Sequence, residues 1–552
     1  MAIQDSGSNY QFYDKMIETF VKRSVFDLSR LHTTTIDFGA IVPVDLIWTL
    51  PKDDFDIRIE HLIRAMPMVC PPMSRMRVFF HTYWMSFDQM YKHWKVFMSK
   101  GRTGKYTATL PYIKLRNTVT AGSLANYLGL PVGLTPQQSE FMQISALPFL
   151  MYQAIYKHYY LNANLHTADT YWFPDDEDDF RLGDGMHTYV YDTDSEIPLD
   201  ELRYRDFAND YFTASLPFPM RGDTPSIGLG GTADVVIDSN RRYNMFFGVD
   251  TADSSIKFGA ERSDSPTGSL YLSGANATSP IWSAAGEGQG LVSNKIVADM
   301  SSVTAVTLDQ LRELVVAQKL MEKMARTDGS YGQFIKTFFD ETPQSAYDFR
   351  PRYVGGNYAP IVTTEVLQSS ESGTTPQGHM SGHGISSADG YIGHLHSDDY
   401  GLCMTVASIM PDSMYCQGID RDWTRKTQEE FYLPERAGLG PQAVTVKEIY
   451  YSAQDPDKLL SYQDRYDEYR YRQNIVSGKV SDPNNLTFFP YTQARYFGSE
   501  PTLSQSFVTT KGNVRHDSFY AGTNEVPFVM QVASKVRAVR PLPYKSIPSG
   551  LA

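Results

Sequence analysis

Four histidines and two aspartates form the densest group of potential metal ligands in the sequence. They are His379, His383, His394, His396, Asp398 and Asp399. Imidazole and carboxylate groups bind divalent metals, but these spacings fit no recognised site. Residues 368–390 are rich in Gly and Ser, which is typical of a loop, and His394 and His396 follow at the expected entrance of a strand. We therefore interpret these histidines as ordinary loop residues that form local hydrogen bonds, and we predict no metal site.

The sequence contains no other pattern that indicates catalysis or cofactor binding. It has no G-x-S-x-G turn, and the GLGG stretch at residues 228–231 lacks the Lys and Ser/Thr of a phosphate-binding loop. The acidic stretch PDDEDDFRLGDG at residues 174–185 does not have the spacing of an EF-hand, which favours a solvated acidic loop. We predict that the chain is not an enzyme and that it has no catalytic residue, cofactor or metal.

Basic and aromatic residues alternate near residue 470, and this pattern could serve nucleic-acid binding. The basic residues are Arg465, Arg470, Arg472 and Lys479, and the tyrosines between them are Tyr462, Tyr466, Tyr469 and Tyr471. Such residues offer charge to phosphates and flat faces to bases, so the four cations are candidate nucleic-acid contacts. The favoured alternative is that they pair with Asp464, Asp467 and Glu468 and bury their rings at a subunit boundary. The C-terminal residues Lys535, Arg537 and Arg540 raise the same question.

The composition limits the classes of function. The 552 residues carry a formal net charge of −13, so the chain as a whole repels polyanions and any contact with nucleic acid must be local. The 36 Tyr, 30 Phe and 6 Trp suit a protein that buries surface against other copies, although a β-rich monomer also favours them. The cysteines are three and scattered, which predicts free thiols and a reducing cytoplasm. No apolar signal core and no stretch of about 18 apolar residues occurs, so we expect no membrane insertion.

The pattern of apolar residues predicts a mainly β protein with helices between the strands. Strands are expected within residues 24–51, 75–85, 400–409 and 443–451, and helices after residue 85 and within residues 123–130, 150–161 and 307–326. The last helix has one apolar stripe and a potential capping box at Thr307 and Gln310. Residues 222–300 are poor in charge and alternate short apolar runs with turn residues, which predicts a β-rich insertion with exposed loops. No repeat is visible, so a β-sandwich or jelly roll with long loops is favoured.

Eight segments, taken in order, resemble the major capsid proteins of the Microviridae, particularly the gokushovirus-like branch. They are RSVFDLSRLHTTTIDFGAIVPVDLIWTLPKDDFDIRI (23–59), NDYFTASLPFPMRGD (209–223), the helix and turn from residue 307, TPQSAYDFRPRYVGGN (342–357), TPQGHMSGHG (375–384), YCQGIDRDWTRKTQEEFYLPERAGLGPQAVTVKEIY (415–450), YQDRYDEYRYRQNIVSG (462–478) and the tail RPLPYKSIPSG (540–550). Each motif alone is weak, but eight in order are hard to explain by chance. The chain departs from the family at Lys52, where a glycine is usual, so this turn could differ.

The resemblance implies a viral jelly-roll β-sandwich with very long loop insertions and several helices in the loops. Residues 1–552 would form a single capsid domain, and residues 222–300 resemble the variable loop that protrudes at threefold axes and could contribute to host attachment. Identical capsid subunits would enclose a circular single-stranded DNA genome in a small icosahedral shell. The implied partners are a small basic DNA-packaging protein, internal scaffolding and pilot proteins during assembly, and a host-cell surface receptor. The protein would be made and assembled in the host cytoplasm and reside in the virion.

Within the segment at residues 415–450, six residues are candidates for contacts between subunits. They are Tyr415, Arg421, Trp423, Arg425, Phe431 and Tyr432. We expect alanine at Trp423 or Arg425 to impair particle yield more than subunit solubility if this segment lies at an interface, whereas equal loss of both would indicate a core role. The alternative function is a β-rich carbohydrate-active enzyme or carbohydrate-binding protein, which the aromatic residues and acidic loops suggest.

Overall fold

The structure is a computed structural model of the 552-residue chain. It describes residues 22–101, 104–162, 164–165, 181–187, 199–223, 308–327, 331–342, 349–367, 369, 377, 380–451, 453–519 and 526–544, together with five strands between residues 234 and 299. Contacts divide the chain into a large unit, Met1–Arg221 with Glu322–Ala552, and a small unit, Gly222–Met321. In the described residues no helix has both the length and the apolar character needed to cross a membrane.

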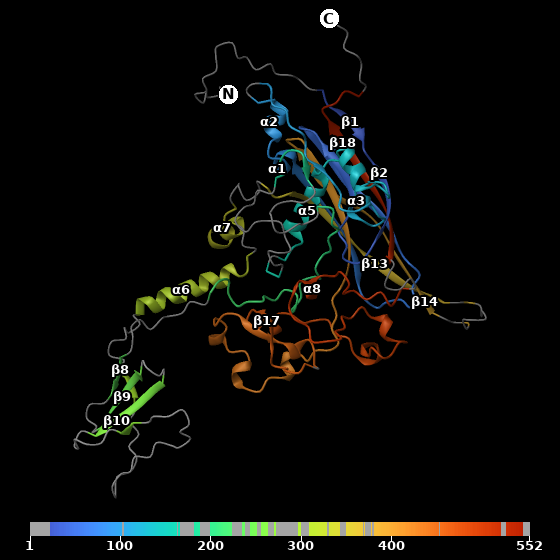
Figure 1. The fold of residues 1–552 in the computed structure, drawn as a ribbon. Coiled ribbons are helices and arrows are strands. Elements are labelled where there is room, and N and C mark those ends of the chain that lie inside the picture. Colours follow the sequence, from blue (N-terminus) through green and yellow to red (C-terminus); the bar gives the residue numbers. More distant parts are fainter. Residues whose placement is uncertain are drawn as a thin grey trace. The chain divides into compact units, whose positions relative to one another are not determined.

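The large unit contains an antiparallel sheet of nine strands that curls around its own core (Figure 1). The strands are β1 (Ser24–Asp27), β2 (Arg30–Ile36), β3 (Val42–Thr49), β4 (Asp53–Ala65), β5 (Met76–Ser86), β13 (Arg352–Leu367), β14 (Met380–Ser397), β15 (Gly401–Pro411) and β18 (Phe528–Arg540). Their order is β1-β18-β4-β14-β13-β5-β15-β3, and β2 also pairs with β18.

Strand β13 joins the two halves of this sheet. It pairs with β5 as far as Ile361 and with β14 from Val362 onward. The strands β2-β18-β4-β14 therefore form one half and β13-β5-β15-β3 the other, and the two halves fold toward each other as in a jelly-roll sandwich. The predicted mainly β jelly-roll fold is confirmed.

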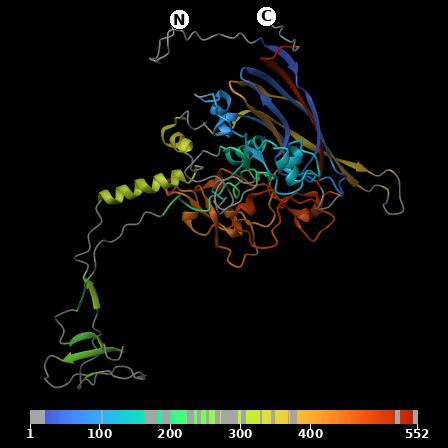
Figure 2. The ribbon, with the colours of Figure 1, turned by 45° about the horizontal axis from the view of Figure 1, so that its top comes forward.

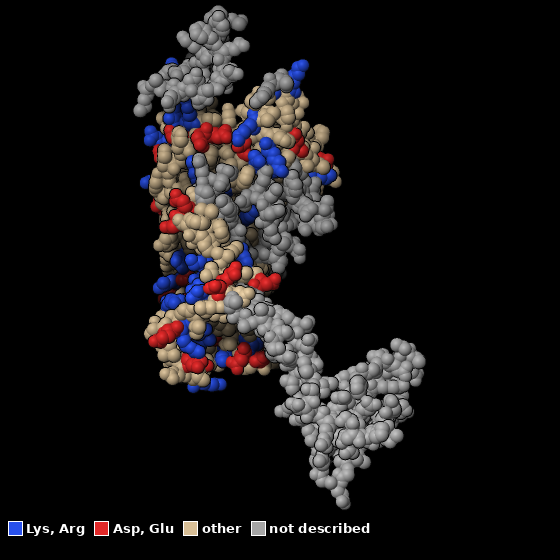
Figure 3. Space-filling model, turned by 90° about the vertical axis from the view of Figure 1, so that its left-hand side faces the viewer, with Lys and Arg blue, Asp and Glu red and all other residues tan. Residues whose placement is uncertain are grey.

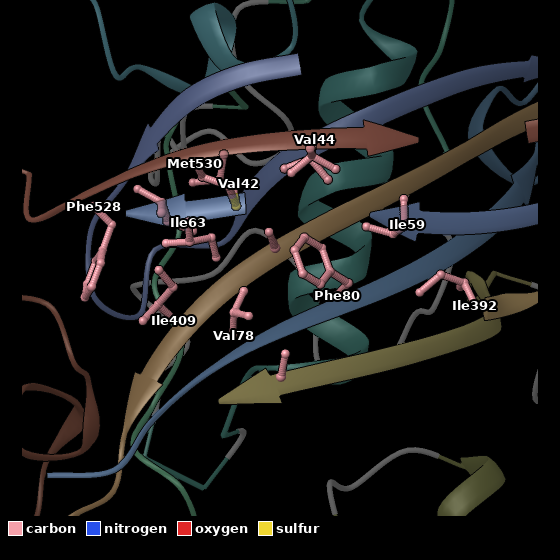
Figure 4. Close-up of a cluster of buried hydrophobic side chains, with 14 of the residues drawn as sticks. Val42, Val44, Ile59, Ile63, Val78, Phe80, Ile392, Ile409, Phe528 and Met530 are labelled. Atoms are coloured by element: carbon pink, nitrogen blue, oxygen red, sulfur yellow. The ribbon is translucent and has the colours of Figure 1, made fainter. Parts of the chain in front are cut away.

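Two apolar clusters hold the sheet in place. In β4, Phe55, Ile57 and Ile59 point inward and alternate with charged residues, as expected of a strand with one face buried. Together with Val42, Val44, Val78, Phe80, Ile409, Phe528 and Met530 they fill the space between the two halves (Figure 4). Strand β15 is buried along its whole length because helix α5 (Leu147–Tyr159) and its neighbouring loops cover its other face.

Glycines allow β13 and β14 to lie close to each other where the two halves of the sheet fold toward each other. A Cβ atom on Gly355 would lie 2.1 Å from the carbonyl oxygen of Ile392, and one on Gly390 would lie 1.6 Å from the side-chain amide nitrogen of Asn357. A larger residue at Gly355 would force the two strands apart, whereas one at Gly390 would displace the Asn357 side chain.

Short helices and small sheets occupy the long loops of the large unit. The helices are α1 (Phe87–Met90), α2 (Trp94–Ser99), α3 (Leu124–Tyr127), α4 (Pro136–Phe141), α7 (Tyr331–Phe339) and α8 (Gln505–Val508). The short strands are the pairs β6 (Tyr112–Ile113) with β7 (Met186–His187) and β16 (Gln442–Thr445) with β17 (Leu459–Gln463). The predicted helices at residues 123–130 and 150–161 are confirmed as α3 and α5. The helix predicted after residue 85 is two helices, because the backbone at Tyr91 is extended.

Two other expectations differ from the structure. Residues 380–390 belong to strand β14 rather than to a loop, because β4 and β13 pair with them on either side. The strand expected at residues 443–451 ends at Thr445, where Glu448 accepts hydrogen bonds from the Thr445 backbone and hydroxyl groups and turns the chain into a 3₁₀ helix, Val446–Glu448.

The small unit contains strands β8 (Asp234–Ile237), β9 (Tyr243–Asp250), β10 (Ser255–Arg262), β11 (Leu270–Tyr271) and β12 (Ile296–Asp299). Strands β9, β10 and β11 form one antiparallel sheet, and β8 pairs with β12. The predicted helix at residues 307–326 is confirmed as α6 (Leu308–Met324), although none of its residues is buried. Thr307 of the expected capping box lies outside the described residues.

Candidate subunit interface

The predicted contact residues lie between strands β15 and β18, in residues 412–527, which we call the loop region. This region builds its own small core from Tyr415, Val444 and Ile449 together with Tyr211 and Phe212, which come from elsewhere in the large unit. Seven 3₁₀ helices, among them Arg421–Trp423 and Asp467–Tyr469, turn the described chain around this core. The side chains that project from the region are therefore fixed by compact turns rather than by the sheet.

Tyr415 belongs to the core of the loop region and not to its surface. It is 4% exposed, and its hydroxyl donates a hydrogen bond of 2.7 Å to Asp210. Burial and the nearby Asp210 carboxylate raise the pKa of the Tyr415 hydroxyl well above its ordinary value. The guanidinium of Arg495 packs beside it on the rings of Phe207 and Phe507. Tyr415 can thus support the surface only from beneath.

Arg421 is half-buried and is held by an acidic residue from a neighbouring turn. Its guanidinium lies 3.6 Å from the carboxylate of Glu448 and donates a hydrogen bond of 3.0 Å to the Ala443 carbonyl. Burial alone would lower the pKa of Arg421, but the Glu448 charge raises it above its ordinary value. The hydroxyl of Tyr211 donates to the same carboxylate at 3.0 Å. Arg421 therefore fixes the turn that precedes Trp423.

Arg425 lies beneath the exposed aromatic residues and positions them. Its side chain is 7% exposed and pairs with Asp422 at 2.7 Å and with Glu468 at 3.4 Å. The guanidinium also stacks on the rings of Phe431, at 5.3 Å, and Tyr469, at 4.6 Å. Since the ion pairs and the stacking involve one side chain, Arg425 connects three separate turns of the loop region.

The surface above Arg425 carries three aromatic rings, Phe431, Tyr432 and Tyr469, which we call the aromatic patch. They are 51%, 53% and 52% exposed. Tyr466, which is 3% exposed, supports them: its ring contacts Tyr432, and its hydroxyl donates to the Phe431 carbonyl at 3.2 Å. The patch is therefore held in one conformation before any partner binds, which reduces the entropy lost on binding.

Trp423, the single tryptophan in the sequence of the loop region, is 84% exposed. It borders a hollow of about 330 Å³ that Ile419 and Ile475 also line. These two isoleucines are 41% and 68% exposed. A second hollow of about 220 Å³ adjoins the first through Ile475 and is lined by Arg421 and Arg472. Exposed apolar side chains around a hollow, with polar groups at the rim, are typical of a surface that another protein covers.

The four candidate nucleic-acid contacts form fewer ion pairs with nearby carboxylates than the favoured alternative predicted. Only Arg470 pairs with a carboxylate of its own segment, Asp467 at 3.5 Å. Asp464 instead pairs with Arg326, and Glu468 with Arg425. Among the described residues, no carboxylate lies within ion-pair distance of Arg465, Arg472 or Lys479; the ammonium of Lys479 lies over the Phe488 ring at 5.8 Å.

The charges of the large unit form no extended field of one sign on the face that Figure 3 shows in colour, where Lys/Arg and Asp/Glu side chains are interspersed. The net charge of −13 predicts that any contact of the four basic residues with a phosphate chain is local.

The candidate metal-ligand histidines that the structure describes lie on strand β14 and not in a loop. His394 Nδ1 lies 3.0 Å from Asp56, and His396 Nδ1 lies 2.6 Å from Asp54, both on the neighbouring strand β4. Partial burial would raise the pKa of Asp54, but hydrogen bonds from His396 and Arg23 lower it below its ordinary value. In the described part of the chain no group of three or more His, Cys, Asp or Glu side chains could hold a metal ion. His379 lies outside the described residues.

Sequence reasoning missed Ile419 and Ile475 as surface residues. Each is a single apolar residue in a segment rich in turns, so no periodic pattern marks it. Tyr469 is among the tyrosines expected to contact bases or a subunit boundary, and its ring lies on the exposed surface.

Comparisons with known proteins identify the family of the chain. A family model described as capsid protein (F protein) matches residues 15–550. Capsid protein VP1 of Chlamydia phage 1 is 26% identical, with 96% of each chain covered, and VP1 of Bdellovibrio phage phiMH2K is 26% identical, with 91% of each covered. VP1 of Spiroplasma virus 4 is 22% identical over 96% of this chain and 95% of its own.

These matches confirm the predicted resemblance to the major capsid proteins of the Microviridae and exclude the alternative of a carbohydrate-active enzyme. The chain belongs to the phage capsid protein (F protein) family and is a structural subunit that oligomerises with identical copies in a virion.

Proposed function

We propose that copies of this chain form a small icosahedral shell around a circular single-stranded DNA genome. The observation that carries this proposal is the surface of the loop region, where Trp423 is exposed and the aromatic patch is exposed yet supported from beneath by Arg425 and Tyr466. A soluble subunit gains nothing from such a surface, whereas a subunit in a closed shell buries it against a neighbour.

Within this surface, the six predicted contact residues have two different roles. Trp423, Phe431 and Tyr432 would contact the neighbouring subunit directly, because their rings are at least half exposed. Arg421, Arg425 and Tyr415 would act from beneath, because each is held by carboxylates of its own chain. Interface energy concentrates in a few large aromatic residues of this kind, surrounded by groups that exclude water.

The proposed DNA contacts are Arg465, Arg470, Arg472 and Lys479. Three of them have no carboxylate partner among the described residues, which leaves their charges free for phosphates. Four cations cannot balance a genome when the subunit itself carries −13. A small basic packaging protein and counterions would therefore neutralise most of the DNA charge.

Residues 222–300 would form a surface insertion on a single jelly-roll domain and would contribute to host attachment through a cell-surface receptor. Their low charge and loop-like composition support this assignment. Internal scaffolding and pilot proteins would act during assembly in the host cytoplasm. Deleting residues 222–300 should abolish adsorption to host cells while particles still form; intact adsorption of the deleted particles would contradict the attachment role.

The direct test of the shell is electron microscopy of particles that contain the chain, followed by nuclease digestion. We expect uniform particles with icosahedral symmetry that protect circular single-stranded DNA. A chain that stays monomeric under all conditions, and that is never recovered with virions, would contradict the proposal.

A further inference from the structure

The far ends of strands β13 and β14 form a two-stranded ribbon that extends beyond the rest of the sheet (Figures 1 and 2). In this ribbon Val362–Leu367 of β13 pairs with Met380–Ile385 of β14. The pairing of β13 with β5 stops at Ile361, and the pairing of β14 with β4 starts at Ile385. An isolated pair of strands is only marginally stable in water, so the ribbon needs support from outside itself.

One side of the ribbon already has that support. Met68 exchanges two backbone hydrogen bonds with Gly382, of 3.1 and 3.3 Å, and so covers the outer edge of β14. The hydroxyl of Thr363 donates to the Pro72 carbonyl at 3.1 Å. Gly382 and Gly384 lie so close to Ala65, Met68 and Pro71 that a Cβ atom would clash there. The segment before β5 therefore covers one face and one edge of the ribbon.

The other edge, Val362–Leu367 of β13, pairs with no strand among the described residues. Val362, Val366 and Leu367 are 53%, 50% and 59% exposed. Proteins usually protect such an edge with charged residues, Pro or a β-bulge, because it would otherwise pair with other chains. The sequence VTTEVL at residues 362–367 contains one charged residue, Glu365, and no Pro, and its pairing with β14 shows no shift in register.

We propose that this edge pairs antiparallel with the same edge of a second copy of the chain, around a two-fold axis at Thr364. The inference rests on the proposed shell, in which identical subunits meet. The two ribbons would then form one four-stranded sheet, with β13 of each copy at its centre. Such an interface is isologous: the same residues contribute from both copies.

The sequence of the edge favours this partner and this register. With Thr364 on the axis, Val362 of each copy lies opposite Val366 of the other, and β-branched residues stabilise each other across strands. Glu365 then lies opposite Thr363. A register with Glu365 on the axis would instead place two carboxylates opposite each other, which is unfavourable. The edge is therefore complementary to itself with Thr364 on the axis. A shift of the axis by one residue, to Glu365, makes the pairing repulsive.

A cysteine at position 364 tests this register directly. Opposite residues of antiparallel strands have Cα atoms about 4.5–5.5 Å apart, a distance that a disulfide bond can span. Particles that carry Thr364→Cys should therefore yield covalent dimers under mild oxidation. Glu365→Cys is the matched control, because its thiols would point to the opposite face and lie too far apart. The natural cysteines Cys70 and Cys403 are buried, and the unmodified chain controls for Cys416.

A charge variant provides a second test that does not depend on oxidation. Thr364→Lys would place two ammonium groups on the axis and should lower particle yield about tenfold. His383→Lys adds the same charge to the neighbouring position of β14, away from the edge, and should leave the yield within about twofold.

The outcomes separate this inference from the shell itself. The Thr364→Cys variant could form particles that yield no covalent dimer on oxidation and whose new thiol reacts fully with a maleimide. That result would overturn the ribbon pairing and leave the proposed shell intact. Dimers with Glu365→Cys but not with Thr364→Cys would overturn the register. An unmodified chain that forms no particles would contradict the shell, and with it the ribbon pairing.

Discussion

The jelly-roll core and the loop region use aromatic residues in opposite ways. Between the halves of the sheet, rings such as Phe55 and Phe80 are buried and contact apolar side chains. In the loop region, Trp423 and the aromatic patch are exposed, and the charged group of Arg425 holds the patch in place. Under the proposed function, the core stabilises the single subunit, whereas the loop region provides the surface that binds neighbouring subunits. Mutations in the two regions should therefore separate stability from assembly.

The largest effect is expected in the core. Phe80 is 1% exposed between the two halves of the sheet, and Phe80→Ala should lower the free energy of unfolding by about 3–5 kcal/mol because it leaves a cavity. Urea unfolding of the purified subunit measures this change. Particle yield should fall only as far as folded subunit is lost. A stable variant that fails to assemble would show that the core also controls assembly.

Arg425→Ala should lower both subunit stability and particle yield. This result would distinguish a supporting residue of the loop region from its exposed aromatic residues. The mutation removes the cation beside Glu468, whose side chain is only 10% exposed, and the cost should be about 3 kcal/mol. It also releases Phe431 and Tyr469 from the stacked guanidinium. The free energy of unfolding and the particle yield should therefore decline together, as expected of a residue with a core role. A loss of yield at unchanged stability would instead place Arg425 at the interface.

The pH dependence of stability should come from the covered side of the sheet. Burial lowers the pKa of His81 to about 4 and that of His158 to about 3. In the unfolded chain both titrate near 6.5, so the unfolded state binds protons first as the pH falls. Stability should therefore decrease between pH 7 and pH 5. His81→Gln should reduce that decrease by about 1–2 kcal/mol in urea unfolding at the two pH values. An unchanged pH dependence would contradict the assignment.

The smallest effect is expected at the turn between β3 and β4. Lys52 has φ +68°, a left-handed conformation that favours glycine, the residue usual here in the family that the sequence resembles. Lys52→Gly should raise the free energy of unfolding by up to about 1 kcal/mol without changing particle yield. Lys52→Ala, which keeps the strain, serves as the control.

The sequence predicted the elements whose signal is local and missed those that depend on distant partners. Strands β5 and β15 are dense in apolar and β-branched residues, and helix α6 has a clear stripe, so all three were predictable. Strand β14 was not, because its glycines reflect close contacts with β13 and with the segment before β5 rather than a loop.

The same limit applies to the candidate site. Tyr415, Trp423 and Arg425 are similar candidates by residue type and lie in one segment. Their burial differs because Asp210 and Glu468 bind the first and third from distant parts of the chain. No pattern within the segment itself reveals those partners.

The most direct test of the division between core and loop region is Trp423→Ala, measured for subunit stability and particle yield in the same preparation. The side chain is 84% exposed, so the free energy of unfolding should change by less than about 0.5 kcal/mol. Particle yield should fall at least about tenfold, and Trp423→Tyr should restore part of it. Normal particle yield with Trp423→Ala, or a loss of yield explained by unfolding, would contradict the role of the loop region in assembly.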